Sequence, residues 1–154
     1  MAYGLKPVRI KGPYEIVKKV MKSNTTITKY DPVHLEDDTA DLAATAEAIY
    51  GVAMETQTNA TGGTTQIEIL VGADIVYKAD SDEDTNTFGA SGYGGGKTFQ
   101  ITGTTGAVQV DVSTAGEPTG TGVASAQIVC VDESPEPSDT SIGLFKIYST
   151  ANVG

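Results

Sequence analysis

The chain has 154 residues and a mass of 15.9 kDa, which is enough for one domain with a buried core. It holds 14 Val, 11 Ile and 21 Thr against 5 Leu, and β-branched side chains favour strands over helices. A single cysteine excludes an intramolecular disulfide scaffold, and no apolar run approaches the ~20 residues that a membrane-spanning helix needs. Composition therefore excludes a helical bundle, a coiled coil and a helical membrane protein.

The charge is divided unevenly along the chain. The net charge is −10, yet residues 1–30 carry seven basic side chains and one acid, whereas residues 31–154 carry three basic side chains and 19 acids. A basic leading segment on an acidic body indicates an interaction arm, and the target that it suits best is an acidic protein surface or the acidic body of a neighbouring subunit. Nucleic acid is the weaker alternative, because an acidic body repels phosphate and no aromatic residues interleave the lysines. A solvated basic strand without a partner is also left open.

In chain order, the first expected element is an extended segment. Residues 1–13 hold two glycines and two prolines, which do not form a helix interior or a central strand. We therefore expect an N-terminal arm that becomes ordered only on contact, ahead of a single β domain over residues 14–154. Residues 14–21 fit either a strand or an amphipathic helix, and the alanine-rich residues 39–48 fit either a helix or a turn and strand.

The rest of the chain reads as short strands. The candidates are residues 25–28, 31–35, 49–54, 66–71, 75–77, 98–102, 107–112, 128–131 and 144–148. Residues 72–74 read as the turn of a hairpin. Residues 80–97 and 132–141 form long loops that are too polar for a core and are typical of mobile or binding segments. The pattern predicts an all-β fold: a small β-barrel or a β-tulip/sandwich with an extended N-terminal arm and long acidic Gly/Thr-rich loops.

One acidic stretch has part of a calcium-loop pattern. The first four ligand positions are filled by Asp80, Asp82, Asp84 and Asn86. Thr85 and Ser91 stand where that loop needs Gly and Glu, and the flanking segments are strand-like. A solvated acidic tip is the preferred interpretation, with a weakly bound divalent cation left open.

The other chemical motifs are weak. Residues 96–98 end like a phosphate-binding loop, but a strand follows them where that loop requires a helix. His34 is the only histidine and has no recognisable catalytic context, and Cys130 sits in a strand-like run where a small buried thiol fits. We therefore expect a protein that is not an enzyme, with no cofactor and no metal.

Two short motifs resemble a known family. They are DPVHL at residues 31–35 and, after an alanine-rich turn, IYGVA at residues 49–53. This order is similar to that of tailed-bacteriophage capsid decoration (head cement) proteins, and the resemblance covers residues 10–80. It implies a β-barrel or β-tulip domain without catalysis that binds the outside of an assembled shell, often around local symmetry axes. The expected function is a non-enzymatic virion structural protein, made in the host bacterial cytoplasm and located on the capsid exterior.

The resemblance also implies partners. They are the major capsid protein shell and neighbouring copies of the chain, in a homo-oligomer for which a trimer is one option, with no nucleic acid and no membrane. Alternatives are a phage tail or fibre component, or a secreted surface- or carbohydrate-binding β-domain, although the latter favours Trp platforms and the chain has no Trp. The arm residues expected to contact the partner are Leu5, Lys6, Val8, Arg9, Ile10, Lys11 and Tyr14. Ile16 extends their apolar set.

Overall fold

Thirteen β-strands make up the regular structure in the part of the chain that the computed structural model describes, which is residues 4–82, 88, 97–116, 127–132 and 141–148. The strands are β1 (Lys6–Ile10), β2 (Tyr14–Val20), β3 (Thr25–Ile27), β4 (Pro32–Glu36), β5 (Thr39–Leu42), β6 (Gly51–Ala53), β7 (Gln57–Asn59), β8 (Gln66–Gly72), β9 (Ile75–Asp80), β10 (Thr98–Thr102), β11 (Gln109–Gly116), β12 (Ile128–Asp132) and β13 (Ile142–Ile147). No helix occurs in these ranges. The all-β prediction is confirmed there.

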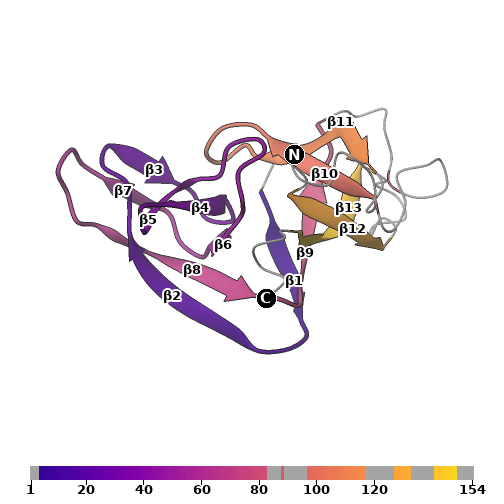
Figure 1. The fold of residues 1–154 in the computed structure, drawn as a ribbon, viewed down its shortest axis with the longest axis horizontal. Helices are drawn as coiled ribbons and strands as arrows, with labels where there is room; N and C mark the ends of the chain where they lie inside the picture. Colours follow the sequence, from indigo (N-terminus) through magenta and orange to yellow (C-terminus); the bar gives the residue numbers. More distant parts are fainter. Residues whose placement is uncertain (1–3, 83–87, 89–96, 117–126, 133–140, 149–154) are drawn as a thin grey trace.

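The strands form two main antiparallel sheets, which occupy the two ends of the molecule in Figure 1. The six-stranded sheet has the order β1-β9-β13-β12-β10-β11, the five-stranded sheet has the order β2-β8-β6-β4-β5, and β3 pairs with β7. Each main sheet curls until its two sides meet through one isolated bridge, Ser81 with Val110 in the first and Met21 with Ala40 in the second. Within the described strands neither sheet closes by a continuous ladder, so of the predicted alternatives a sandwich-like fold fits.

One long antiparallel ribbon runs through both sheets. β1 pairs with β9 in the six-stranded sheet, and β2, the next strand in the chain, pairs with β8 in the five-stranded sheet. The ribbon bends between them, where the Lys11 N–H donates to the Asp74 carbonyl at 2.9 Å. Gly72 approaches the Pro13 carbonyl so closely that a Cβ on it would lie 3.1 Å from that oxygen. In Figure 1 the indigo strands β1 and β2 meet at this sharp corner.

The bend changes the hairpin expected from the sequence at residues 72–74. β8 and β9 do not pair with each other, because β8 lies between β2 and β6 whereas β9 lies between β1 and β13. The hairpin predicted at residues 72–74 is therefore wrong, and these residues pass between sheets. The later alternating strands do pair, as β10 and β11, across residues 103–106, where Gly103 and Gly106 adopt positive φ.

The two segments that fitted either helix or strand are both extended. β2 alternates as a strand should, with Val17 packed on the core of the five-stranded sheet and Tyr14 and Ile16 exposed. Thr39–Leu42 forms β5 and pairs with β4, after which the chain turns, with Ala46 at a φ of 69°. Pairing with β4 thus overrides the helix propensity of Ala40, and the alanines after it lie in the turn.

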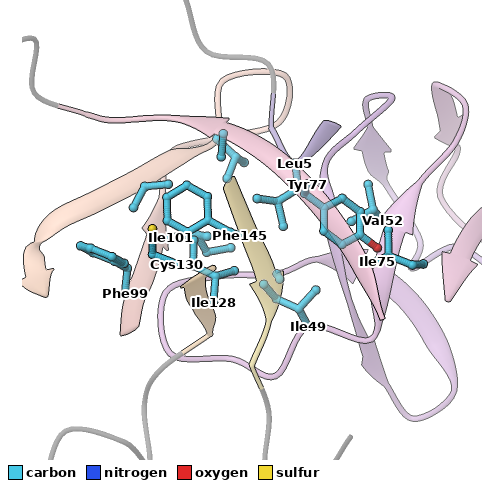
Figure 2. Close-up of a cluster of buried hydrophobic side chains, with 14 of the residues drawn as sticks. Leu5, Ile49, Val52, Ile75, Tyr77, Phe99, Ile101, Ile128, Cys130 and Phe145 are labelled. Atoms are coloured by element: carbon cyan, nitrogen blue, oxygen red, sulfur yellow. The ribbon is translucent and has the colours of Figure 1, made fainter. Parts of the chain in front are cut away.

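The main hydrophobic core fills the curled six-stranded sheet and reaches the five-stranded sheet through Val52. Figure 2 shows Phe99 and Phe145 at one end of this core, close to Cys130, which is buried as predicted. The rings of Phe88, Phe99 and Phe145 pack edge to face, with centroids 5.2 to 5.9 Å apart. The core is therefore continuous between the sheets and is centred on aromatic side chains.

Phe88 corrects the interpretation of residues 80–97 as too polar for the core. Its side chain is 1% exposed, although it sits among acidic and glycine residues in the sequence. Gly143 makes room for it, since a Cβ there would lie 2.9 Å from the Phe88 ring. The remainder of the loop predictions, on residues 83–87, 89–96 and 133–140, falls outside the described residues.

Two buried polar side chains connect loops at the junction of the sheets. The Asp31 carboxylate accepts hydrogen bonds from the Thr28 N–H at 2.9 Å, the Thr105 hydroxyl at 2.6 Å and the Gly106 N–H at 3.0 Å. The Gln127 amide donates to two carbonyls in residues 44–47 and accepts from a backbone N–H of β10. Because buried polar groups are costly when unpaired, these bonds hold the loops in one arrangement.

We expect Phe88→Ala to lower the free energy of unfolding by about 3–5 kcal/mol, since it removes one ring of a packed aromatic trio and leaves a cavity. Phe88→Leu, which keeps most of the apolar volume, should lose less than half of that. Urea unfolding followed by circular dichroism measures both. A Phe88→Ala value within ~0.5 kcal/mol of the wild type, the usual range for surface substitutions, would place this ring outside the core.

Candidate functional site

Exposed apolar side chains gather where the ribbon bends. In the described part of the chain, the large apolar side chains that remain 42–55% exposed are Val8 and Ile10 on β1 and Tyr14 and Ile16 on β2. Val131 on β12, at 38%, is the remaining one in that part. Scattered exposed apolar residues need no explanation, but four on two consecutive strands form a patch of the kind that marks a binding surface.

The patch lines a groove on the inner side of the bend, which we call the bend groove. Its volume is about 340 Å³. Its walls and floor are formed by Pro7, Val8, Arg9, Ile10, Tyr14, Ile16, Met54 and Leu70. Leu70 is buried and Met54 half-buried, so the groove reaches down to the main core from a mouth formed by β1 and β2.

Local backbone features create this geometry. Gly12 has a φ of 152°, which glycine tolerates better than other residues, and Pro13 follows it at the bend. A β-bulge between Pro7 and Arg9 leaves Val8 without a partner on β9. Bulges redirect side chains and twist the strand locally. The bend therefore turns β1 toward β2, and the bulge presents Val8 in the groove.

Five of the seven basic residues of the leading segment fall into two sets. At the far end of β2, Lys19 pairs with Asp38 at 2.6 Å, and Lys22 pairs with Glu36 at 2.8 Å and Asp41 at 3.1 Å. Hydrogen bonds to these carboxylates raise the pKa of both lysines. This part of the basic segment is therefore neutralised by the chain's own acidic body.

The second set lies at the bend groove. Arg9 lines the groove, and Lys6 and Lys11 are exposed on either side of it along the chain. Among the described residues none of the three has an ion-pair partner, although the Lys6 ammonium lies 5.9 Å from the centre of the Tyr30 ring. An apolar groove lined by an arginine without an ion-pair partner is an arrangement suited to a partner with apolar and acidic groups.

The structure brings four of the seven predicted site residues together in the groove, while Lys6 and Lys11 are exposed but are not among its lining residues. Val8, Arg9, Ile10 and Tyr14 line the groove, as does Ile16. Leu5 is 1% exposed and packs in the main core, while its N–H donates to the Tyr30 carbonyl at 2.9 Å. The prediction that Leu5 contacts a partner is therefore wrong, because the same apolar character that suggested a contact places it inside the fold.

The interpretation of residues 1–13 as an arm without a fold of its own also needs correction. Lys6–Ile10 is strand β1 of the six-stranded sheet, paired along its length with β9. Pro7 argues against a central strand, and β1 is an edge strand, where a missing N–H is tolerated. Sequence reasoning missed Pro7, Met54 and Leu70 as groove residues, since no local pattern connects them to β2.

Other candidate sites are engaged in structural contacts. His34 is half-buried and its Nδ1 lies 2.9 Å from the Ala48 carbonyl. Asp80 is buried beside Gln109, and Asp82 accepts from the Val112 N–H at 3.2 Å. The described residues contain no group of three metal-ligating side chains, and Asp84 and Asn86 of the calcium-loop pattern lie outside them.

The phosphate-loop pattern falls partly on residues that the structure describes. Thr98 begins β10, so a strand follows the motif at residues 96–98, as the sequence indicated, and Gly96 itself lies outside the described residues.

In the described ranges no helix has the length and apolar character needed to cross a membrane. Comparison with known protein families, curated proteins and solved structures finds no match to this chain.

The bend is held from its outer side by an ion pair whose strength depends on pH. The Lys146 ammonium on β13 pairs with the Asp74 carboxylate, which lowers the pKa of Asp74 below its ordinary value of 3.8. A lowered pKa means that the folded state binds the proton less readily than the unfolded state. The pair therefore stabilises the fold above pH 3.8 and loses this effect as the pH falls below that value.

We expect Asp74→Asn to melt at a lower temperature than the wild type at pH 6, and the difference to shrink as the pH is lowered from 4 to 2.5. Lys146→Gln should behave in the same way, and the double variant should lose no more than either single variant. Thermal unfolding by circular dichroism across this pH range measures all three. A difference that stays constant with pH would assign the loss to something other than this pair.

Proposed function

We propose that this chain is a non-enzymatic virion structural protein that decorates and stabilises the outer surface of a tailed-phage capsid. The observation that carries the proposal is the bend groove, an apolar surface with unpaired basic side chains on a chain of net charge −10. A surface of this composition suits docking to another protein. The resemblance of residues 31–35 and 49–53 to capsid decoration proteins supplies the class of target.

The two motifs that carry the resemblance lie side by side in the fold. Residues 32–36 form β4 and residues 51–53 form β6, and the strands pair through Pro32 with Val52 and Val33 with Gly51. Motifs separated in sequence but adjacent in one sheet behave as a single structural unit. This adjacency supports the family assignment, within which we interpret the pair of curled sheets as a β-tulip or sandwich-type decoration domain.

The proposed partners are the major capsid protein and neighbouring copies of the chain, with a trimer as one arrangement. The chain would be made in the host bacterial cytoplasm and would finish on the capsid exterior. A large negative net charge keeps free copies apart by repulsion before they dock. The proposal includes no chemical reaction, cofactor, nucleic acid or membrane contact.

The direct test is to mix the purified chain with shells assembled from the capsid protein of its own phage, and to image them by cryo-electron microscopy. We expect density on the shell exterior at symmetry-related positions, with saturation at a fixed ratio of chain to shell subunit. Density confined to tails or fibres would replace capsid decoration with the tail alternative. Shells left bare while the chain binds surface glycans would favour the secreted binding-domain alternative.

Salt should distinguish steering by charge from anchoring by apolar contact. The screening length falls from ~10 Å at 0.1 M salt to ~3 Å at 1 M, so we expect the association rate to fall about tenfold while dissociation changes little. Replacing Lys6, Arg9 and Lys11 with Gln should reproduce the high-salt association rate at low salt. Surface plasmon resonance on immobilised shells measures both rates.

The matched control removes the same number of charges from the other end of β2. Lys18, Lys19 and Lys22 each lie within 4.0 Å of an acidic oxygen of the same chain. Their replacement by Gln should slow association less than the change at the bend groove. Equal rates for the wild type and the bend-groove variant would make the unpaired cations a solubility feature and remove charge steering from the proposal.

A further inference from the structure

We infer that the bend groove is a pocket for one apolar side chain of an extended partner segment, with an acidic residue beside that side chain facing Arg9. The inference rests on the proposed function only for the source of the segment, which we assign to the shell protein. It specifies recognition by an inserted side chain and a neighbouring charge. This mode of binding differs from strand addition, in which a partner segment pairs with the backbone of an edge strand.

The shape of the groove suits an inserted side chain better than a flat contact. Its volume of about 340 Å³ lies at the lower end of the ~300–1,000 Å³ that ligand pockets span. Its mouth is walled by side chains from two strands, while Met54 and buried Leu70 form a floor. Buried anchors in such pockets supply most of the binding energy of an interface, and the flexible thioether of Met54 can adjust to the anchor.

The charge of Arg9 determines which partner residue fits beside the inserted apolar side chain. Arg9 lines the groove itself, and no acidic side chain is among the described residues that line it. Docking an apolar side chain there removes water from around the guanidinium. An acidic neighbour on the partner would compensate for this, because a guanidinium pairs well with a carboxylate in a fixed geometry. A partner segment that combines an apolar and an acidic residue fits these requirements.

The edge of β1 is poorly built for strand addition. Pro7 lacks an N–H, the bulge at Val8 breaks the regular ladder, and Lys6 and Arg9 place charge along the strand. Proline, bulges and charged side chains are features that keep edge strands from pairing with other chains. Recognition at the bend groove therefore depends on side chains rather than on the backbone of β1.

A second copy of the chain is a weaker occupant than a different protein. A two-fold contact of groove with groove would bring Lys6, Arg9 and Lys11 of both copies together, which like charge opposes. In a head-to-tail contact, Val131 is the exposed large apolar side chain that the described surface offers outside the groove. The shell protein is therefore the occupant to which the inference commits.

The test uses the isolated full chain and three short peptides, with ¹³C-methyl NMR as the readout. The first peptide, Ser-Glu-Leu-Phe-Asp-Ser, has apolar residues flanked by acids. The second has Gln and Asn in place of the acids, and the third has Ser in place of Leu and Phe. We expect the first to shift the methyl signals of Val8, Ile10 and Ile16 saturably at roughly millimolar concentration, the weak end of the affinity scale. The second should bind roughly threefold more weakly.

Variants of the chain locate the contact. Ile16→Ser should weaken the first peptide roughly tenfold, whereas Val131→Ser, a matched change of an exposed apolar side chain on β12, should leave its affinity unchanged. Arg9→Gln should reduce affinity for the first peptide to that of the second and should abolish the difference between them. That loss of difference is a double-mutant cycle, which isolates the pairing of Arg9 with the acid.

The remaining outcomes count against either the inference or the proposed function. It fails if no peptide shifts the groove methyls, if the third peptide binds as well as the first, or if Ile16→Ser binds as the wild type does. Shells that the Ile16→Ser variant decorates normally would overturn the groove assignment and leave capsid decoration standing. Peptide binding at the groove together with bare shells would overturn the proposed function and leave the pocket standing. A photo-cross-link from the groove to a second copy would replace the shell protein as occupant.

Discussion

The continuity of one bent antiparallel ribbon is the constraint on which the rest of the structure depends. β1 and β2 are consecutive strands, as are β8 and β9, and each pair is split between the two main sheets. Both sheets must therefore meet along the bend, where the Lys11 N–H reaches the Asp74 carbonyl and Gly72 passes close to Pro13. β1 and β2 are also edge strands of their sheets. The inner side of the bend is therefore formed by two strands that no other described strand covers. This open inner side is the bend groove.

The opposite side of the junction is held by buried polar bonds rather than by sheet pairing. Asp31 ties the loop before β4 to residues 105 and 106, and Gln127 ties β10 to residues 44–47. Asp31 also begins the DPVHL motif that carries the family resemblance. Asp31 therefore has a structural role within the chain, because its carboxylate accepts hydrogen bonds from the loops around it.

The contacts of each basic side chain depend on which side chains the fold places beside it. Lys19 and Lys22 belong to the same basic segment as Arg9, yet they neutralise acids on β4, β5 and the turn between them. Arg9, which has no ion-pair partner among the described residues, lies beside exposed apolar side chains, and a surface that combines both features suits partners that combine apolar and acidic groups. The features that protect β1 as an edge strand, its proline, its bulge and its charges, also shape and charge the groove.

The sequence by itself determined the all-β class, most strand positions and the buried Cys130, because β-branched content and period-two alternation are local properties. It also identified Val8, Arg9, Ile10 and Tyr14 as candidate contacts, since charge and apolar character near a chain end are visible without a fold. Only the tertiary structure decided that Leu5 is buried, that β8 and β9 part into different sheets, that Phe88 enters the core, and that Met54 and Leu70 complete the groove. These depend on which strands become neighbours, and strand pairing joins residues that no local pattern relates.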